Sequence, residues 1–465
     1  MTNKKYFWWI ATLTAGIYFF SWFAVDALKV NRLDIQSEDT IPAVFLPLSI
    51  IKDKSLYLDK YYSMMLARYP NPDDKDHVLG PMPFYLREAG GHYLSAFPII
   101  SAVLALPVYF PAILLDVSVT WQSLALLAHI SGALIMGFGT GFFYILISKF
   151  FNLPAKTTLL TTLVYGFATI NYSLVSQGLW QHGTVQLFTT ISLIYFMQYF
   201  QFKKLTNLIY FGFFMGFAVL SRPTALLVFA ALGVYIIFSE QLTLKEATRK
   251  SAYILFGLIF PVMFFLWYNA KFYLNIQNQG YSNQLTRNWL GNFPFSFFGV
   301  WLSPSKGILV YSPVFIFSLI GARLALKKRP TNYIFLAFTF IVLAHTLVIS
   351  FWKHWFGGWS YGYRMSSDIL PFLVLLLVPW LQSEIKGKAL KVFIAVLVVS
   401  VMVQISGIVF FDGVWHAAYD KGFKNTAWLW SIKDSEAAFN MRRVLVKAGL
   451  LDKACEVCAM KAAPF

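Results

Sequence analysis

The feature that most limits how this chain can fold is a series of apolar runs, most of them close to 20 residues long. Counting the first, there are twelve, at about 6–28, 96–116, 122–148, 157–176, 183–202, 206–221, 223–239, 252–270, 308–326, 332–352, 369–382 and 390–411. About 20 apolar residues cross the hydrocarbon core of a bilayer as a helix, and they are too many for a barrel strand. We therefore predict an all-α polytopic membrane protein.

Composition supports this class and excludes another. Hydrophobic residues make up 58% of the chain and charged residues 13%, while the formal net charge is +17. The basic residues are dispersed in short connections between the runs, as positive-inside bias predicts, and they form no concentrated patch. We therefore expect no nucleic-acid partner. The same charge favours membrane lipids with anionic headgroups or a substrate that carries phosphate.

The basic connections also predict orientation. They fall in every second connection, so they should share one face, the cytoplasmic one. Lys4 and Lys5 place the N-terminus there too, and the first run lacks a cleavage site, so it is expected to be a span. The N-terminus and the basic connections can lie on the same face only if one run between the first span and Lys149 does not cross the membrane. Run 96–116 is the candidate, because it carries Pro98, Pro107 and Pro111, which disrupt helices.

We therefore expect about eleven transmembrane helices plus one re-entrant or interfacial segment. The alternative is that all twelve runs cross and the charge rule fails at one connection. The whole chain, 1–465, is predicted to be a single transmembrane domain. It has a large first external loop at 29–95 and a short external C-terminal tail at 412–465, in which we read Cys455 and Cys458 as ordinary tail residues.

Acidic residues gather at the start of the first external loop. The stretch DIQSEDTIPAVFLP contains Asp34, Glu38 and Asp39, in a chain with only 21 acids. Acids at a membrane surface either solvate a loop or form a reaction centre.

Unusual polar and aromatic residues are predicted on that same face. Their ordinary roles would be helix caps, an aromatic belt, surface ion pairs such as Arg364 with Asp368 at i,i+4, and snorkelling cations. Their convergence with the acids favours a binding site. The candidates are His92, Trp180, His182, Arg222, Lys353, His354, Trp359, Tyr361, Arg364 and Asp368.

Such a set suits a sugar linked to a lipid phosphate. Aromatic faces stack on sugar rings, and Arg or Lys neutralises a phosphate leaving group. A carboxylate can accept the proton of the attacking hydroxyl, as in inverting glycosyl chemistry.

The chain resembles the polytopic GT-C glycosyltransferases, which include the protein mannosyltransferases and the lipid A aminoarabinose transferases. The resemblance lies in EDTIPAVFLP, GHYLSAFPI, SRPTALLV and GGWSYGYRMSSDILPFLVLL. It implies a polyprenyl-phosphate-sugar donor, reaction at the outer face, and an acid in the first loop as base or acceptor-positioning group. Asp39 matches that acid best, with Asp34 and Glu38 as second choices.

The chain also departs from the pattern of the superfamily. The acidic stretch 34–47 has no D-x-D pair, and the chain has Gln181–His182 where relatives often carry an Asp. The metal requirement and the acceptor therefore stay open, and a divalent metal held by Asp39 with His92 or His182 is one alternative.

The resulting hypothesis is a glycosyltransferase (hexosyl- or pentosyltransferase) of a bacterial inner membrane. It would move a sugar to a lipid, glycan or protein acceptor. Asp39 would be the catalytic residue, Arg222 and Arg364 would contact the donor phosphate, and Trp180, His182, Trp359 and Tyr361 would shape the sugar pocket, with His92 nearby. A lipid-linked sugar transporter or flippase and a polysaccharide polymerase or ligase are the alternatives.

Overall fold

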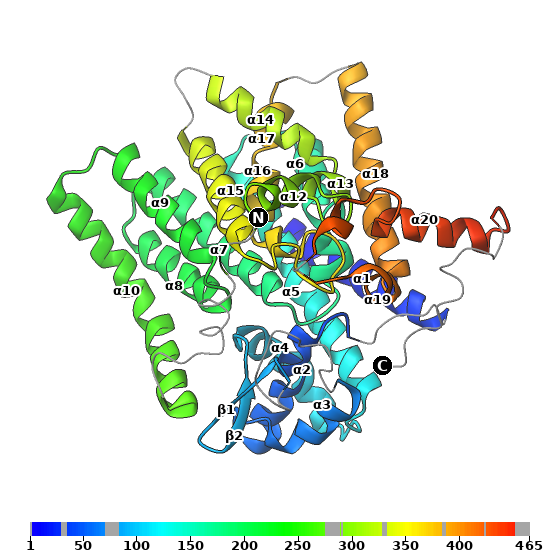
Figure 1. The fold of residues 1–465 in the computed structure, drawn as a ribbon. Helices are drawn as coiled ribbons and strands as arrows, with labels where there is room; N and C mark the ends of the chain where they lie inside the picture. Colours follow the sequence, from blue (N-terminus) through cyan, green and yellow to red (C-terminus); the bar gives the residue numbers. More distant parts are fainter. Residues whose placement is uncertain are drawn as a thin grey trace.

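A computed structural model describes residues 2–28, 35–69, 83–274, 289, 292–327, 333–383, 387–422 and 425–451. In these residues the fold is helical, with 19 α-helices and one two-stranded hairpin (Figure 1). The predicted all-α class is confirmed.

Six helical segments in the described residues are long and apolar enough to cross a membrane, which indicates a multi-pass membrane protein. They are Lys5–Ala27 in α1 (Thr2–Ala27), α5 (Trp121–Phe150), Leu244–Tyr273 (α10, Leu244–Tyr268, with η5, Asn269–Tyr273), α15 (Tyr333–Phe351), Arg364–Leu381 (η6, Arg364–Ile369; α16, Leu370–Leu375; α17, Val378–Leu381) and α18 (Lys388–Phe410).

The other predicted runs form shorter or broken helices. Three are apolar but only 15 or 16 residues long: α4 (Ile100–Leu114), α8 (Thr206–Ser221) and α9 (Ala225–Ser239). α7 (Gln181–Phe202) is longer and more polar. Two runs are interrupted, giving α6 (Ala155–Phe167) with the π-turn η4 (Asn171–Val175), and α13 (Ile308–Tyr311) with α14 (Phe315–Lys327). Eleven full-length spans are therefore not seen in the part of the chain that the structure describes.

Local sequence explains how the long helices begin and pack. α5 starts at a capping box of Thr120 and Ser123, which satisfies backbone N–H groups that have no partner within the helix. α8 carries Gly212-x-x-x-Gly216, and a Cβ at Gly212 would lie 2.3 Å from the carbonyl oxygen of Ile254 in α10. Small residues let helix backbones approach this closely in membranes.

The predicted first external loop is a compact lobe in its described parts, seen at the bottom of Figure 1. Phe45, Leu58, Met65 and Tyr85 are buried in its core, and α2 is buried along its whole length because IPAVFLPL has no polar face. The elements of the lobe are η1 (Glu38–Thr40), α2 (Ile41–Leu48), η2 (Ser49–Asp53), η3 (Asp59–Tyr61), α3 (Tyr62–Arg68), β1 (Leu86–Ala89) and β2 (His92–Ser95). The two strands are antiparallel, with Leu86 opposite Ser95 and Ala89 opposite His92.

The helix bundle has two distinct ends. α7 begins next to Asp368, which bonds to His182, and it ends at Lys203, which pairs with Glu240. Glu240 also holds Lys250 at 2.5 Å. We call the end that contains Lys203, Glu240 and Lys250 the basic end, and the end that contains His182 and Asp368 the site end. The basic connection between α7 and α8 and the one between α9 and α10 therefore share one end of the bundle.

The described part of the C-terminal tail is packed against the site end. Ser303 donates to the carbonyl of Leu429 at 2.7 Å, and Lys306 Nζ lies 3.0 Å from His416 Nε2. Within the tail, Arg443 pairs with Asp412 at 2.5 Å. Its elements are α19 (Val414–Tyr419), η7 (Ala427–Trp430) and α20 (Glu436–Lys447), and α12 (Phe295–Leu302) ends at Ser303. The tail therefore contributes to the structure behind the site.

Candidate active site

Asp39 and Arg364, both proposed from sequence, are in direct contact. Arg364 Nη1 lies 2.5 Å from Asp39 Oδ2, although the residues are 325 positions apart. Asp39 is carried by the turn η1, whose N-cap, Ser37, accepts a bond from the Asp39 backbone N–H. The Asp39 side chain is 25% exposed and that of Arg364 is 11% exposed, so the acid is the more accessible partner.

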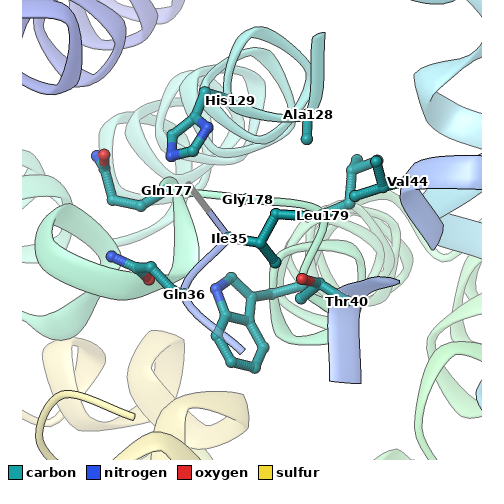
Figure 2. A pocket seen from close by; sticks show the side chains of 10 residues that line it. Ile35, Gln36, Thr40, Val44, Ala128, His129, Gln177, Gly178 and Leu179 are labelled. Carbon is teal, nitrogen blue, oxygen red and sulfur yellow. The ribbon is translucent and has the colours of Figure 1, made fainter. Parts of the chain in front are cut away.

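Trp180 completes this group and lines a pocket beside it. The Arg364 guanidinium carbon lies 5.1 Å from the centre of the Trp180 ring, a cation–π contact. The pocket is shown in Figure 2, with the side chains of Gln36, His129 and Gln177 on one side and those of Thr40, Val44 and Leu179 on the other. Its cavity volume of about 10 Å³ leaves room for about one water molecule.

A buried ionic cluster centred on Asp368 lies next to this group. His182 Nδ1 is 2.8 Å from Asp368 Oδ1, Arg222 Nε is 3.0 Å from Asp368 Oδ2, and Thr224 donates to Oδ2 at 2.7 Å. His345 Nε2 lies 3.8 Å from the same oxygen. The carboxylate is thus paired by partners from three different elements, as a buried charge requires.

The cluster fixes the tautomer of His182. Arg222 Nη1 lies 2.7 Å from His182 Nε2 and 3.1 Å from Nδ1, and Asp368 Oδ1 lies 2.8 Å from Nδ1. Because a carboxylate can only accept, the ring proton is on Nδ1, where it is donated to Asp368, and Nε2 accepts from Arg222. His182 is a neutral link between a cation and an anion.

Arg364 and Asp368 do not pair with each other, contrary to the simplest reading of their i,i+4 spacing. They lie in η6, a 3-10 turn, and each has its partner elsewhere: Arg364 in the lobe and Asp368 in the bundle. Arg222 is likewise committed to the Asp368 cluster and is only 8% exposed, so it supports the site from within.

His92 is placed on the surface of the lobe. Its Nδ1 is 2.8 Å from Asp59 Oδ2, and its ring stacks on Tyr57 at 4.1 Å. It pairs with neither Asp39 nor His182, because β2 points it towards η3.

The remaining candidates lie in the segment after α15, in η1 or outside the described residues. Trp359 lies against His416 with ring centres 5.7 Å apart, and Tyr361 is fully buried, with its hydroxyl donating to the Val403 carbonyl at 2.6 Å. Lys353 and His354 are half-buried in the turn after α15. Glu38 precedes Asp39 in η1. Asp34, Cys455 and Cys458 lie outside the described residues.

A second buried polar cluster was missed in the sequence. Lys306 Nζ lies 3.0 Å from His416 Nε2 and 3.3 Å from the Gly358 carbonyl oxygen, and it also donates to the Ser360 carbonyl. Glu436, on α20, accepts from the Tyr311 hydroxyl at 3.2 Å. A lysine between apolar runs, in SPSKGILV, was the available signal.

Burial shifts the pKa values of this second cluster. Desolvation lowers the pKa of Lys306 to about 8, although the charge of Glu436 opposes the shift. Desolvation raises the pKa of Glu436 to about 7, against the attraction of Lys306. Desolvation, followed by the charge of Lys306, lowers the pKa of His416.

Within the part of the chain that the structure describes, no group of three or more His, Cys, Asp or Glu side chains is arranged to hold a metal ion. Asp39 pairs with Arg364, and His182 with Asp368, so the metal pairing considered from sequence is not formed among these residues.

Comparisons with protein-family models, with curated proteins and with solved structures find no match for this chain. The functional argument therefore depends on the geometry of the site.

Proposed function

We propose that the chain is an integral membrane glycosyltransferase. It moves a sugar from a polyprenyl-phosphate-linked donor to a lipid, glycan or protein acceptor at the non-cytoplasmic face. The observation that carries the proposal is the contact between Asp39 and Arg364, 2.5 Å apart, with Trp180 against the guanidinium. A carboxylate, a cation and an aromatic ring are the three groups that this chemistry needs in one place.

The pair suggests how a donor would start the reaction. Arg364 is the counter-ion of Asp39 in the structure. A donor phosphate offers the guanidinium two oxygens in a fork geometry, so it competes for Arg364. Its arrival frees the Asp39 carboxylate to accept a proton.

The transfer step then balances within the site. The acceptor oxygen forms a bond to the anomeric carbon as the bond from that carbon to the phosphate oxygen breaks. The acceptor proton passes to Asp39, and the electron pair leaves with polyprenyl phosphate, whose charge Arg364 neutralises. The Asp368 cluster holds η6, which carries Arg364, in place.

The proposal includes a membrane orientation. The lobe and the site end face the non-cytoplasmic side, and the basic end faces the cytoplasm. α4 carries Pro107 and Pro111 inside the helix, and it is the run that dips into the membrane without crossing. About eleven crossings are then made by the other runs, several of them by short or broken helices.

A transfer assay with the purified protein tests the proposal. Lipids that co-purify with the protein are identified by mass spectrometry, and the polyprenyl-phosphate sugar found is resynthesised with a radiolabel. Wild type should transfer label to a membrane acceptor, and Asp39→Asn should not. Asp59→Asn, which changes an exposed acid of the same lobe paired with His92, is the control and should keep activity. Full transfer by Asp39→Asn would show that Asp39 is not the group that accepts the proton of the acceptor.

One observation favours a second candidate, a lipid-linked sugar transporter or flippase. Asp368 and His345 are buried ionisable residues within two of the apolar spans, and such residues often mark substrate or proton paths. A fluorescent lipid-linked sugar that moves between leaflets of proteoliposomes without being cleaved would favour this function over transfer.

A further inference from the structure

The segment 357–364 presents Arg364 to Asp39, and it has little regular structure of its own. Gly357, Gly358 and Gly362 have φ values of +82°, +61° and +63°. The left-handed backbone of these glycines turns the chain sharply and is open to many other conformations. Contacts from outside the segment must therefore decide its shape.

Two of those contacts hold the second half of the segment. The Tyr361 hydroxyl lies 2.8 Å from Ser406 Oγ as well as bonding to Val403, and the Tyr363 hydroxyl lies 2.7 Å from Ser312 Oγ. Both tyrosines are buried. This half is fixed to α18 and to the turn after α13.

The buried side chain of Lys306 contacts the first half. Lys306 is 1% exposed, and its ammonium group meets three acceptors: the carbonyl oxygens of Gly358 and Ser360, and Nε2 of His416. An ammonium has three hydrogens, so the group is fully used. Charge-assisted bonds to carbonyls are stronger than neutral ones, and here they tie the two residues on either side of Trp359 to the turn 303–307.

A simpler role for Lys306 must be separated from this one. Glu436 is also buried, and its charge and that of Lys306 stabilise each other. Lys306 could therefore serve only as a counter-charge that lets Glu436 and α20 pack. The two roles predict different results when Glu436→Gln is added to Lys306→Met. If Lys306 is only a counter-charge, the added change should restore both stability and hydrogen exchange to wild-type values, whereas a positioning role predicts that only stability recovers.

We infer that Lys306 is a positioning residue for the site: by holding the carbonyl groups of Gly358 and Ser360 it sets the course of the segment 357–364 and keeps Arg364 against Asp39. The effect of Lys306 on the course of the segment is independent of the proposed function, and only its effect on catalysis rests on that function.

The test compares four full-length variants in lipid nanodiscs at pH 7.5, between the pKa values of Glu436 and Lys306: Lys306→Met, Glu436→Gln, the Lys306→Met/Glu436→Gln double variant, and Lys250→Met. Lys250→Met is a matched control, because Lys250 is also largely buried and ion-paired but lies at the basic end. The melting temperature reports stability, amide hydrogen exchange reports the order of segment 357–364, and the labelled-donor assay gives turnover and KM.

We expect Lys306→Met to lower the melting temperature, because it removes the cation that stabilises the buried Glu436 carboxylate. The double variant should recover stability. Exchange in segment 357–364 should nevertheless stay faster than in wild type on the order of tenfold, the equivalent of one or two lost bonds. The KM for the donor should rise with it, while Lys250→Met leaves exchange in this segment unchanged.

Wild-type exchange in segment 357–364 of the double variant would overturn the inference, since Lys306 would then be only a counter-charge. If exchange rises as expected but wild type transfers no sugar, the positioning role stands and the proposed function fails. The two failures are thus distinguishable.

Discussion

At the scale of single residues, Gly357 links backbone shape to the position of Arg364. A Cβ built on Gly357 would lie 3.3 Å from both Cβ and Nε of Arg364, whereas one on Gly358 would meet nothing within 4 Å. Both glycines have positive φ, so alanine costs each about 1–2 kcal/mol of backbone strain. We predict similar losses of melting temperature for Gly357→Ala and Gly358→Ala, but a larger fall in turnover for Gly357→Ala. Equal turnover in the two variants would show that the contact between position 357 and Arg364 does not affect activity.

A second residue-scale prediction concerns pH and Glu436. Its pKa is raised by burial from 4.5 to about 7, so the folded state binds the proton more tightly than the unfolded chain does. The stability from this proton is fully present below pH 4.5 and is lost as pH rises to about 7.

Glu436→Gln mimics the protonated acid and can still accept from Tyr311. The melting temperatures of wild type and variant should therefore agree near pH 4.5, and the variant should be the more stable at pH 8. Parallel curves across this range would show that the carboxyl group does not titrate there.

The sequence allowed part of the candidate site to be predicted. Asp39, Trp180, His182, Arg222 and Arg364 were chosen because polar and aromatic residues are conspicuous between apolar runs, and the structure brings them together in two adjoining groups. Their pairing could not be predicted, because the partners come from distant parts of the chain. Asp39 and Arg364 are 325 positions apart.

At the scale of elements, hydrophobic runs predicted where helices form better than where they break. The breaks occur at prolines and tight turns, as at Pro371 and Pro379 in the buried segment Arg364–Leu381. Apolar composition gives no sign of them, since a buried broken helix is as apolar as a continuous one. A proline does not decide the matter either, because Pro107 and Pro111 lie inside the continuous helix α4. The lobe was missed for a similar reason: its short elements are stabilised by packing against each other.

Helix packing gives an element-scale prediction. Gly212→Ala places a methyl group against the backbone of α10, 2.3 Å from a carbonyl oxygen, so α8 and α10 must separate. Gly233, in α9, has nothing within 4 Å, and alanine there should be neutral or improve helix stability by up to about 1 kcal/mol. Thermal unfolding in detergent should show a lower melting temperature for Gly212→Ala only. An unchanged value would mean that the two helices are not in this close contact.

At the scale of the whole molecule, the structure separates a site end from a basic end, and the proposed orientation assigns each to one side of the membrane. Single cysteines at exposed positions test this in a background with Cys455→Ser and Cys458→Ser. Lys52→Cys, in the lobe, should react with a membrane-impermeant maleimide in intact cells. Lys204→Cys and Lys245→Cys, at the basic end, should react only after permeabilisation. Labelling of all three in intact cells would contradict the orientation.

The central claim is that Asp39 and Arg364 act together in sugar transfer. The most direct measurement is a double-mutant cycle on turnover, with Asp39→Asn, Arg364→Gln and the double variant assayed with the labelled polyprenyl-phosphate sugar in proteoliposomes. We predict that each single change lowers turnover by roughly 10²- to 10⁴-fold, and that the double change costs far less than the product of the two, because the groups act as a unit. Full turnover by Asp39→Asn, or effects that simply multiply, would contradict the account.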